Sequence, residues 1–258
     1  HGQSHPRRGE SLHLLPAVPQ GQGQRDGGQR DEVAGASRRP LARNRRAAMT
    51  PSVEFIHEPP PGFRFTLPAD PALSPDGRMV ACVVQDSSGT PKLAIRPLDR
   101  AEVRVLPGTD DASLPFWSPD GRSVGFFSEG KLRKFALDGT APLVLADAAD
   151  ARGGSWSSSG TIVFVPTASG PAYTVPASGG NAVQVTTLDP ERGEFGHRYP
   201  CLLQDESHFL YIAFGRNGKR WLCVGSIDAG PSRVLRETET ASQRSVPGWI
   251  LAVERRRV

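Results

Sequence analysis

The sequence predicts an all-β fold made of repeated four-stranded antiparallel sheets, and three observations predict it. The 258-residue chain contains 28 Gly and 24 Pro, a composition that favours many turns and short strands over long helices. The phrase Ser-Pro-Asp-Gly-Arg occurs at 74–78 and again at 118–122. Short apolar runs follow these and related phrases at intervals of about 40–45 residues, a period typical of stacked repeats.

The repeated phrase predicts a hairpin turn. Proline presets φ to about −65°, aspartate bonds nearby backbone amides, and glycine accepts the left-handed conformation. The two full copies consist of Ser74, Pro75, Asp76 and Gly77, and of Ser118, Pro119, Asp120 and Gly121. Weaker copies stand at 157–160 (Ser-Ser-Ser-Gly) and 203–206 (Leu-Gln-Asp-Glu), where we expect looser turns. A fifth unit is expected to begin at Pro247-Gly248.

Each turn is followed by predicted strands in the same order. The first is expected at Met79–Val84, Val124–Phe127, Ile162–Val165, Phe209–Ala213 and Trp249–Val253. The second is expected at Leu93–Leu98, Leu132–Leu137, Ala172–Pro176 and Trp221–Ile227. The last is expected at Val103–Leu106, Pro142–Leu145, Val183–Thr187 and Arg233–Leu235. Together with the strand that leads into each turn, a unit has four strands.

The strand after the third turn is apolar on both faces. Ile162 and Phe164 point one way, and Val163 and Val165 point the other. Such a strand suits a sheet that packs between two neighbouring sheets. Four antiparallel strands per repeat, stacked face to face, describe the blades of a β-propeller. We therefore predict a partial β-propeller, of about four blades plus the start of a fifth, in residues 49–258.

The first 48 residues differ in composition from the rest. They contain 9 Arg, no Lys and 4 acidic residues, whereas the net charge of the whole chain is +4. They also lack aromatic residues and a sustained apolar period, so we expect a disordered Arg-rich segment. Because Met49 stands where the composition changes, we expect this segment to be upstream sequence that the natural protein lacks. A flexible linker and a basic arm for an acidic partner are the alternatives.

The repeats resemble the TolB-like, WD-repeat-like β-propeller family over roughly residues 60–254. They are most similar to the propeller region of bacterial serine/threonine protein kinases. The phrases that carry this resemblance are Phe116-Trp117-Ser118-Pro119-Asp120-Gly121-Arg122, Gly125-Phe126-Phe127, Lys131-Leu132, Gly153-Gly154-Ser155-Trp156, Val175-Pro176-Ala177-Ser178-Gly179-Gly180, Thr186-Thr187-Leu188-Asp189, His197-Arg198-Tyr199-Pro200 and Val224-Gly225-Ser226.

The resemblance implies a fragment, because such propellers commonly close with six or more blades. The open ends of a partial propeller would then favour self-association. It also implies the extracytoplasmic or periplasmic side of the membrane if the parent is a membrane-anchored kinase, although no run of 18 apolar residues occurs in this chain. The compartment is otherwise open, since three cysteines fit either side of a membrane.

No catalytic constellation, cofactor motif or metal-ligand spacing is apparent in the sequence. Kinase signatures and the Gly-x-Ser-x-Gly elbow are absent from the chain. His57, His197 and His208 lie far apart, and the three cysteines are scattered. We therefore expect no enzyme activity, cofactor or metal in this chain, and no nucleic acid partner.

Three features are candidates for a ligand site, each with a structural alternative that we favour. The charged loop 191–198 offers Glu194, His197 and Arg198 as ligand-face residues, or else as a local ion pair. Asp110 and Asp111 are turn residues rather than a calcium site. Trp117 and Trp156 are packing residues rather than stacking platforms.

The expected function is therefore that of a non-catalytic scaffold that binds a protein or peptide, or senses a ligand. The resemblance implies the propeller part of a serine/threonine kinase. The alternatives are an accessory propeller of a prolyl-oligopeptidase-like serine peptidase and a stand-alone periplasmic TolB-like interaction protein.

Overall fold

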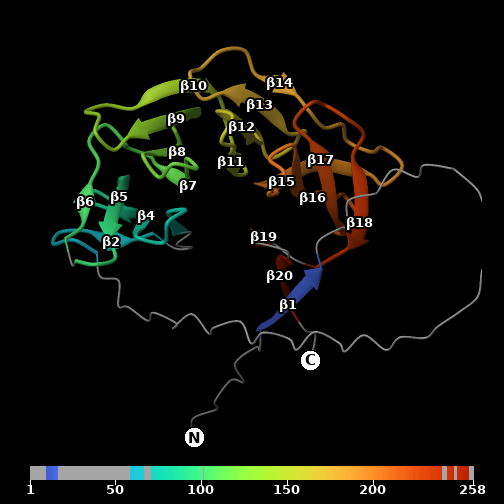
Figure 1. The fold of residues 1–258 in the computed structure, drawn as a ribbon, viewed down its shortest axis with the longest axis horizontal. Coiled ribbons are helices and arrows are strands. Elements are labelled where there is room, and N and C mark those ends of the chain that lie inside the picture. Colours follow the sequence, from blue (N-terminus) through green and yellow to red (C-terminus); the bar gives the residue numbers. More distant parts are fainter. Residues whose placement is uncertain are drawn as a thin grey trace, which may run out of the picture. The chain divides into compact units, whose positions relative to one another are not determined.

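The computed structural model describes residues 59–66, 71–100 and 102–239 in full, together with the backbone of three strands at 10–16, 243–246 and 249–255. All the regular elements in these residues are β-strands, as the composition predicts (Figure 1). None of the described residues forms a helix that is long and apolar enough to cross a membrane.

Four consecutive antiparallel sheets, which we call blades 1 to 4, make up the described core (Figure 1). Blade 1 contains β2 (Arg64–Phe65), β3 (Ala72–Leu73), β4 (Met79–Gln85), β5 (Pro91–Pro97) and β6 (Arg104–Val105). Blade 2 contains β7 (Ser113–Trp117), β8 (Ser123–Ser128), β9 (Lys131–Ala136) and β10 (Leu143–Asp147). Blade 3 contains β11 (Gly154–Trp156), β12 (Thr161–Phe164), β13 (Tyr173–Pro176) and β14 (Val183–Gln184). Blade 4 contains β15 (Glu194–Leu202), β16 (His208–Gly215), β17 (Arg220–Ser226) and β18 (Arg233–Glu237).

In blades 2, 3 and 4 the strands pair with their neighbours in sequence, which confirms the predicted four-stranded unit there. Blades 2, 3 and 4 have simple meander order. In blade 1, both β2 and β3 pair with β4, along different parts of that strand. A further three-stranded sheet has the order β1 (Glu10–Pro16), β20 (Trp249–Arg255) and β19 (Gln243–Val246).

The turns that precede β4, β8, β12 and β16 share one backbone hydrogen bond, although the blade 3 turn is one residue shorter than the others. The amide of Gly77 donates to the Ser74 carbonyl at 2.9 Å, and the equivalent distances in blades 2 to 4 are 2.9, 3.1 and 3.0 Å. The fourth residue of each turn has a positive φ: 71° at Gly77, 68° at Gly121, 83° at Gly160 and 54° at Glu206. The expectation that the third and fourth turns are looser is therefore wrong, because the backbone hydrogen bond forms in the third turn without proline and in the fourth turn without proline or glycine.

Polar side chains in these turns replace one another. In the two full copies, the serine hydroxyl donates to the aspartate Oδ1 at 2.6 Å. The same carboxylate accepts the amide of Arg78 or Arg122 at 3.0 Å. These serine and backbone hydrogen bonds lower the pKa of Asp76 and of Asp120. In the third turn, Ser157 and Ser159 form the corresponding contact at 2.7 Å.

The core consists of apolar layers between successive blades. One cluster joins blades 1 and 2, a second joins blades 2 and 3, and a third joins blades 3 and 4. In β12, Ile162 and Phe164 pack in the second cluster, whereas Val163 packs in the third. A strand apolar on both faces was predicted to lie between two sheets, and it does.

Trp117 of blade 2 contacts blade 1 both by apolar packing and by a hydrogen bond. Its side chain packs in the cluster between these blades, and its Nε1–H donates to the Ala72 carbonyl at 2.8 Å. We expect Trp117→Phe to lower the free energy of unfolding by about 1–2 kcal/mol, because a partly buried carbonyl loses its donor and the ring becomes smaller. Urea titration followed by circular dichroism measures this loss.

Trp221→Phe is the matched control for Trp117→Phe. Trp221 is also buried, but its indole nitrogen donates to no described residue. We expect the smaller loss for this variant. Equal losses in the two variants would contradict a role for the hydrogen bond between blades.

The Arg-rich segment 1–48 lies mostly outside the described residues. Within it, the structure describes β1, whose seven residues pair antiparallel with β20 from Glu10–Arg255 to Pro16–Trp249. Over these seven residues the backbone is a strand, which differs from the expectation of disorder, because another strand supplies its hydrogen-bond partners. The expectation for the rest of the segment stays a prediction, as does the predicted fifth turn at Pro247-Gly248, which also lies outside the described residues.

Candidate functional site

Strands β3, β7, β11 and β15, together with residues of the turns that follow β3, β7 and β15, line a groove of about 650 Å³. Its residues are Pro71, Ala72, Leu73 and Pro75 from blade 1; Leu114, Pro115, Phe116, Trp117 and Pro119 from blade 2; Gly153, Gly154, Ser155 and Trp156 from blade 3; and Tyr199, Pro200, Cys201, Leu202, Leu203 and Glu206 from blade 4. A groove built from equivalent positions of successive repeats has the form that repeat proteins use for extended partners.

Each of three strands that line the groove has a residue with positive φ four positions before its turn. These residues are Leu114 (φ 47°), Gly153 (φ 103°) and Tyr199 (φ 56°). The strand pairing shifts register at Leu114 and at Tyr199, so both lie in β-bulges. Leucine and tyrosine rarely adopt this conformation, and such backbone strain concentrates at binding sites.

Close backbone packing fixes the position of the blade 4 bulge. The Tyr199 amide donates to the Arg152 carbonyl at 2.8 Å. A Cβ atom on Gly153 would lie 3.4 Å from the Tyr199 Cα atom. The groove wall between blades 3 and 4 is therefore formed before any ligand arrives.

The groove is lined mainly by apolar and aromatic side chains. Leu73 is 52% exposed, and Trp156 packs edge-on against Phe116 with ring centroids 6.4 Å apart. Five of the lining residues are prolines, which hold their backbone rigid without a free N–H. Glu206 is the one charged residue among the lining residues. The lining therefore offers an extended partner apolar contacts beside polar surface.

The predicted ligand-face candidates do not line this groove. Glu194 and His197 are buried instead, with Glu194 Oε2 3.2 Å from His197 Nε2. Arg192 donates to Glu194 Oε1 through Nε at 2.9 Å, and the amide of Asp189 donates to Glu194 Oε2 at 2.8 Å. The local ion pair favoured from the sequence is thus present, but it includes Arg192, which had not been singled out.

These contacts set the ionisation of Glu194. Burial raises its pKa, but hydrogen bonds from His197, the Asp189 amide and Arg192 outweigh burial and hold the pKa below the ordinary value of 4.5. The carboxylate is therefore ionised at neutral pH, in a site that is almost closed to water.

The chain Thr186–His197–Glu194 has the order of a nucleophile, base and acid. Thr186 Oγ1 lies 2.8 Å from His197 Nδ1 and accepts the amide of Ala172 at 2.8 Å. Thr109 occupies the equivalent place in blade 1 without a histidine and accepts the amide of Leu93 at 3.0 Å. Because the same bond recurs, the threonine links the segment after the last strand (β6 or β14) to the backbone of the neighbouring strand (in β5, or directly before β13), which indicates a structural role.

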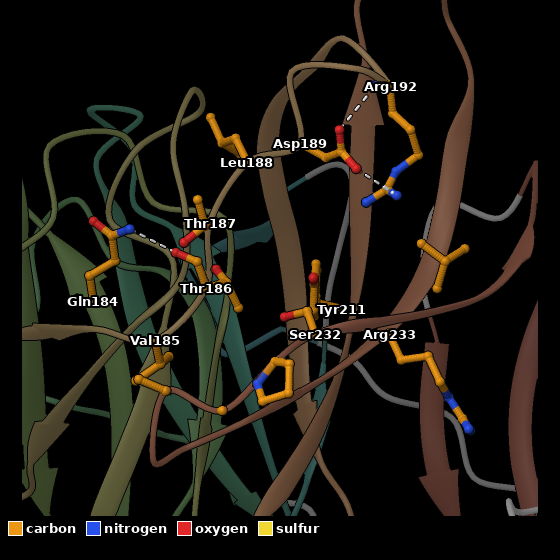
Figure 2. A pocket seen from close by; sticks show the side chains of 14 residues that line it. Gln184, Val185, Thr186, Thr187, Leu188, Asp189, Arg192, Tyr211, Ser232 and Arg233 are labelled. Atoms are coloured by element: carbon orange, nitrogen blue, oxygen red, sulfur yellow. Dashed lines mark hydrogen bonds and ion pairs between the residues drawn. The ribbon is translucent and has the colours of Figure 1, made fainter.

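A second cavity, of about 700 Å³, lies between residues 184–192 and the turn at 229–234 (Figure 2). Figure 2 shows Asp189 and Arg192 on one side of it, joined by an ion pair of 2.7 Å, and Ser232 beside Tyr211. Arg192 is therefore engaged by Asp189 and by the buried Glu194. Because Arg192 is already paired with two carboxylates, it is less available to a ligand. The groove is therefore the stronger candidate site.

The remaining candidates have packing or local roles. The guanidinium of Arg198 lies 4.3 Å from the ring centroid of Phe214. Asp110 pairs with Lys92, and Asp111 is an exposed turn residue with φ 57°. His208 pairs with Asp205 at 2.8 Å, and His57 lies outside the described residues.

The described tryptophans and cysteines differ in accessibility. Trp117 and Trp156 both pack in the clusters between blades, as expected, and both also line the groove, where Trp156 is the more exposed of the two. Burial raises the pKa of Cys82 to about 11 and of Cys223 to about 12, so both thiols stay protonated at neutral pH. No cluster of three metal-ligating side chains occurs among the described residues.

The groove residues were missed because no single one carries a chemical signature. The signal that could have found them is positional. Leu114-Pro115, Gly153-Gly154 and Tyr199-Pro200 stand at the same distance before their turns. Pro71 fits the same register in blade 1. Aligning the four repeats on their turns would have shown this pattern.

Comparison with solved structures places the described sheets in the β-propeller fold. A putative TolB from Agrobacterium tumefaciens matches with a TM-score of 0.63 and 17% identity, over 73% of this chain and 74% of its own. TolB from Acinetobacter baumannii matches with a TM-score of 0.59 and 14% identity, over 71% of this chain and 53% of its own. A puromycin hydrolase matches with a TM-score of 0.51 and 18% identity, over 66% of this chain and 29% of its own.

These identities show the fold and do not show a shared function. No protein-family model matches the chain, and no curated protein is similar to it in sequence. The predicted TolB-like propeller fold is confirmed by its structural neighbours.

Proposed function

We propose that this propeller is a non-catalytic binding module. It holds an extended segment of a protein or peptide partner in the groove that β3, β7, β11 and β15 line. The observation that carries the proposal is the groove itself, in which strained bulges stand at equivalent positions of blades 2 and 4. Apolar and aromatic walls recognise side chains of a partner, and a preformed backbone lowers the entropy cost of binding.

Selection from a random peptide display library tests the proposal, with binding of the enriched peptides measured by fluorescence anisotropy. The test variant is Leu73→Asn, on a two-residue strand within the groove, where the side chain is 52% exposed. The matched control is Val183→Asn, on a two-residue strand outside the groove, where the side chain is 57% exposed.

We expect Leu73→Asn to weaken binding of the enriched peptides about five- to tenfold, because a half-exposed leucine contributes roughly 1–1.4 kcal/mol when a ligand covers it. Val183→Asn should leave binding unchanged. If both variants bind like the parent protein, or if no peptide is enriched, the groove is not the binding site.

We further propose that the chain is part of a propeller associated with a bacterial serine/threonine kinase, where the groove would serve sensing or docking. Support for this comes from the sequence phrases that resemble such propellers. Sequencing the DNA on both sides of the reading frame is the test. A kinase domain upstream supports the proposal, and a hydrolase domain downstream favours the accessory propeller of a serine peptidase instead.

A specific observation keeps the peptidase alternative open. The matched part of the puromycin hydrolase is 29% of that protein, so the same fold occurs there within a longer chain. An isolated reading frame preceded by a signal peptide would favour a TolB-like periplasmic interaction protein. Self-association through open blade faces belongs to the fragment proposal, and light scattering measures it.

A further inference from the structure

One carboxylate stands in the groove where the other repeats have glycine. Glu206 is the fourth residue of the blade 4 turn, and Gly77, Gly121 and Gly160 take that position in the other blades. All four have positive φ, which glycine adopts without strain and glutamate does not. The fourth repeat therefore tolerates a strained residue at this position, and the side chain gained is a carboxylate at the edge of the groove.

Neighbouring atoms orient this carboxylate. The amide of Ser158, in the turn of blade 3, donates to Glu206 Oε2 at 3.2 Å. The Ser158 hydroxyl donates to the same oxygen. No described residue donates a hydrogen bond to Oε1, and no described cation lies within ion-pair distance of Glu206.

The absence of a partner cation distinguishes Glu206 from the other carboxylate near it in sequence. Asp205 pairs with His208 at 2.8 Å and does not line the groove. Glu206 is only partly exposed and lies among prolines, leucines and aromatic rings. The Glu206 carboxylate lies next to apolar walls, so a ligand with a positive charge stabilises it. The groove therefore favours ligands that carry a cation.

We propose that Glu206 is a specificity-determining residue that selects partners carrying a lysine or arginine among apolar residues. This inference rests on the proposed function, because it assigns a class of peptide to the same groove. In the bound state the cation would pair with Glu206, while Ser158 holds the carboxylate and the flanking apolar side chains lie along the aromatic wall.

The experiment uses three peptides derived from one enriched library sequence, with Lys, Gln or Glu at the most enriched polar position. Anisotropy titrations are carried out at low and physiological salt. For the parent protein we expect the Lys peptide to bind about five- to tenfold more tightly than the Gln peptide and the Glu peptide to bind least, with the preference weakened by salt.

Glu206→Gln is the decisive variant because the amide oxygen still accepts from Ser158 while the charge is lost. We expect it to bind the Lys and Gln peptides equally. Asp205→Asn removes the same charge from the next residue outside the groove and should keep the preference for Lys. Thermal melts of both variants separate a loss of fold from a loss of selectivity.

The outcomes distinguish the inference from the function on which it rests. If binding depends on the groove but the Lys peptide binds no more tightly than the Gln peptide, the role of Glu206 is overturned. The proposed binding groove then still stands. A preference for Lys that persists in Glu206→Gln also overturns it. If no peptide depends on Leu73, both the groove and the selectivity are wrong.

Discussion

Replacing Glu194 by alanine is expected to lower the free energy of unfolding by about 3–5 kcal/mol. The side chain is 1% exposed, and its oxygens accept from Arg192, from the Asp189 amide and from His197. Removing the carboxylate leaves these donors without their acceptor in a site that is almost closed to water. Urea titration at pH 7, followed by tryptophan fluorescence, measures the loss.

Glu194→Gln is the matched control for the alanine variant. Its amide oxygen still accepts hydrogen bonds, although the charge that pairs with Arg192 is gone. We expect it to be less destabilised than Glu194→Ala. A loss below about 1 kcal/mol for the alanine variant would contradict the role of this network, because that is the range of an exposed ion pair.

The same network predicts how stability depends on pH. The folded pKa of Glu194 lies below the ordinary 4.5, so the ionised form is favoured in the folded state. Its contribution is present above the unfolded pKa and is lost as the pH falls through the lowered folded pKa. Glu194→Gln should therefore lose less stability than the parent protein when the pH is lowered from neutral to below the ordinary carboxyl value of 4.5.

Replacing Gly125 by alanine is expected to lower the free energy of unfolding by about 2–3 kcal/mol. A Cβ atom at this position would lie 2.3 Å from Cζ of Phe116, whose ring is 9% exposed and packs between blades 2 and 3. The ring has little room to move, because a Cβ on Gly154 would also lie 2.6 Å from it.

A double-mutant cycle tests this cause. Phe116→Ala alone should cost about 3–4 kcal/mol, and Gly125→Ala should add almost nothing in that background, because the clashing ring is gone. Gly230→Ala is the control, since its Cβ would meet only Ser226 at 3.4 Å. Additive losses in the cycle would show that the ring is not what excludes a side chain at Gly125.

Periodicity was enough to predict the sheets, because the fold stacks one local unit. Every predicted strand between Met79 and Leu235 overlaps an observed one. Apolar residues on both faces of β12 also predicted its place between two blades. The looser third and fourth turns were wrongly expected, because residue preferences describe a turn less well than the backbone bonds that close it.

The site was harder to predict than the fold. The charged loop 191–198 made Glu194 and His197 candidates for binding a ligand. In the structure the two side chains contact each other inside the protein. The groove depends on φ values at Leu114 and Tyr199, which neither residue type suggests. Its lining also comes from four segments spread over more than a hundred residues, so only the stacking of the blades brings them together.

The two-faced apolar character of β12 has a consequence for folding. In a half-exposed strand, a slip of one residue moves apolar side chains into water, and this cost enforces the correct alignment. In β12 such a slip would place Val163 and Val165 on the face that Ile162 and Phe164 now occupy. All four residues are apolar, so the hydrophobic penalty of the slip is small. Alignment must therefore be enforced at the strand's start, where the Ser157 amide bonds to the Thr161 carbonyl at 2.9 Å. The recurring polar turns thus set the register of the strands that they join. Substitutions that disrupt these turns would yield compact blades with misaligned strands.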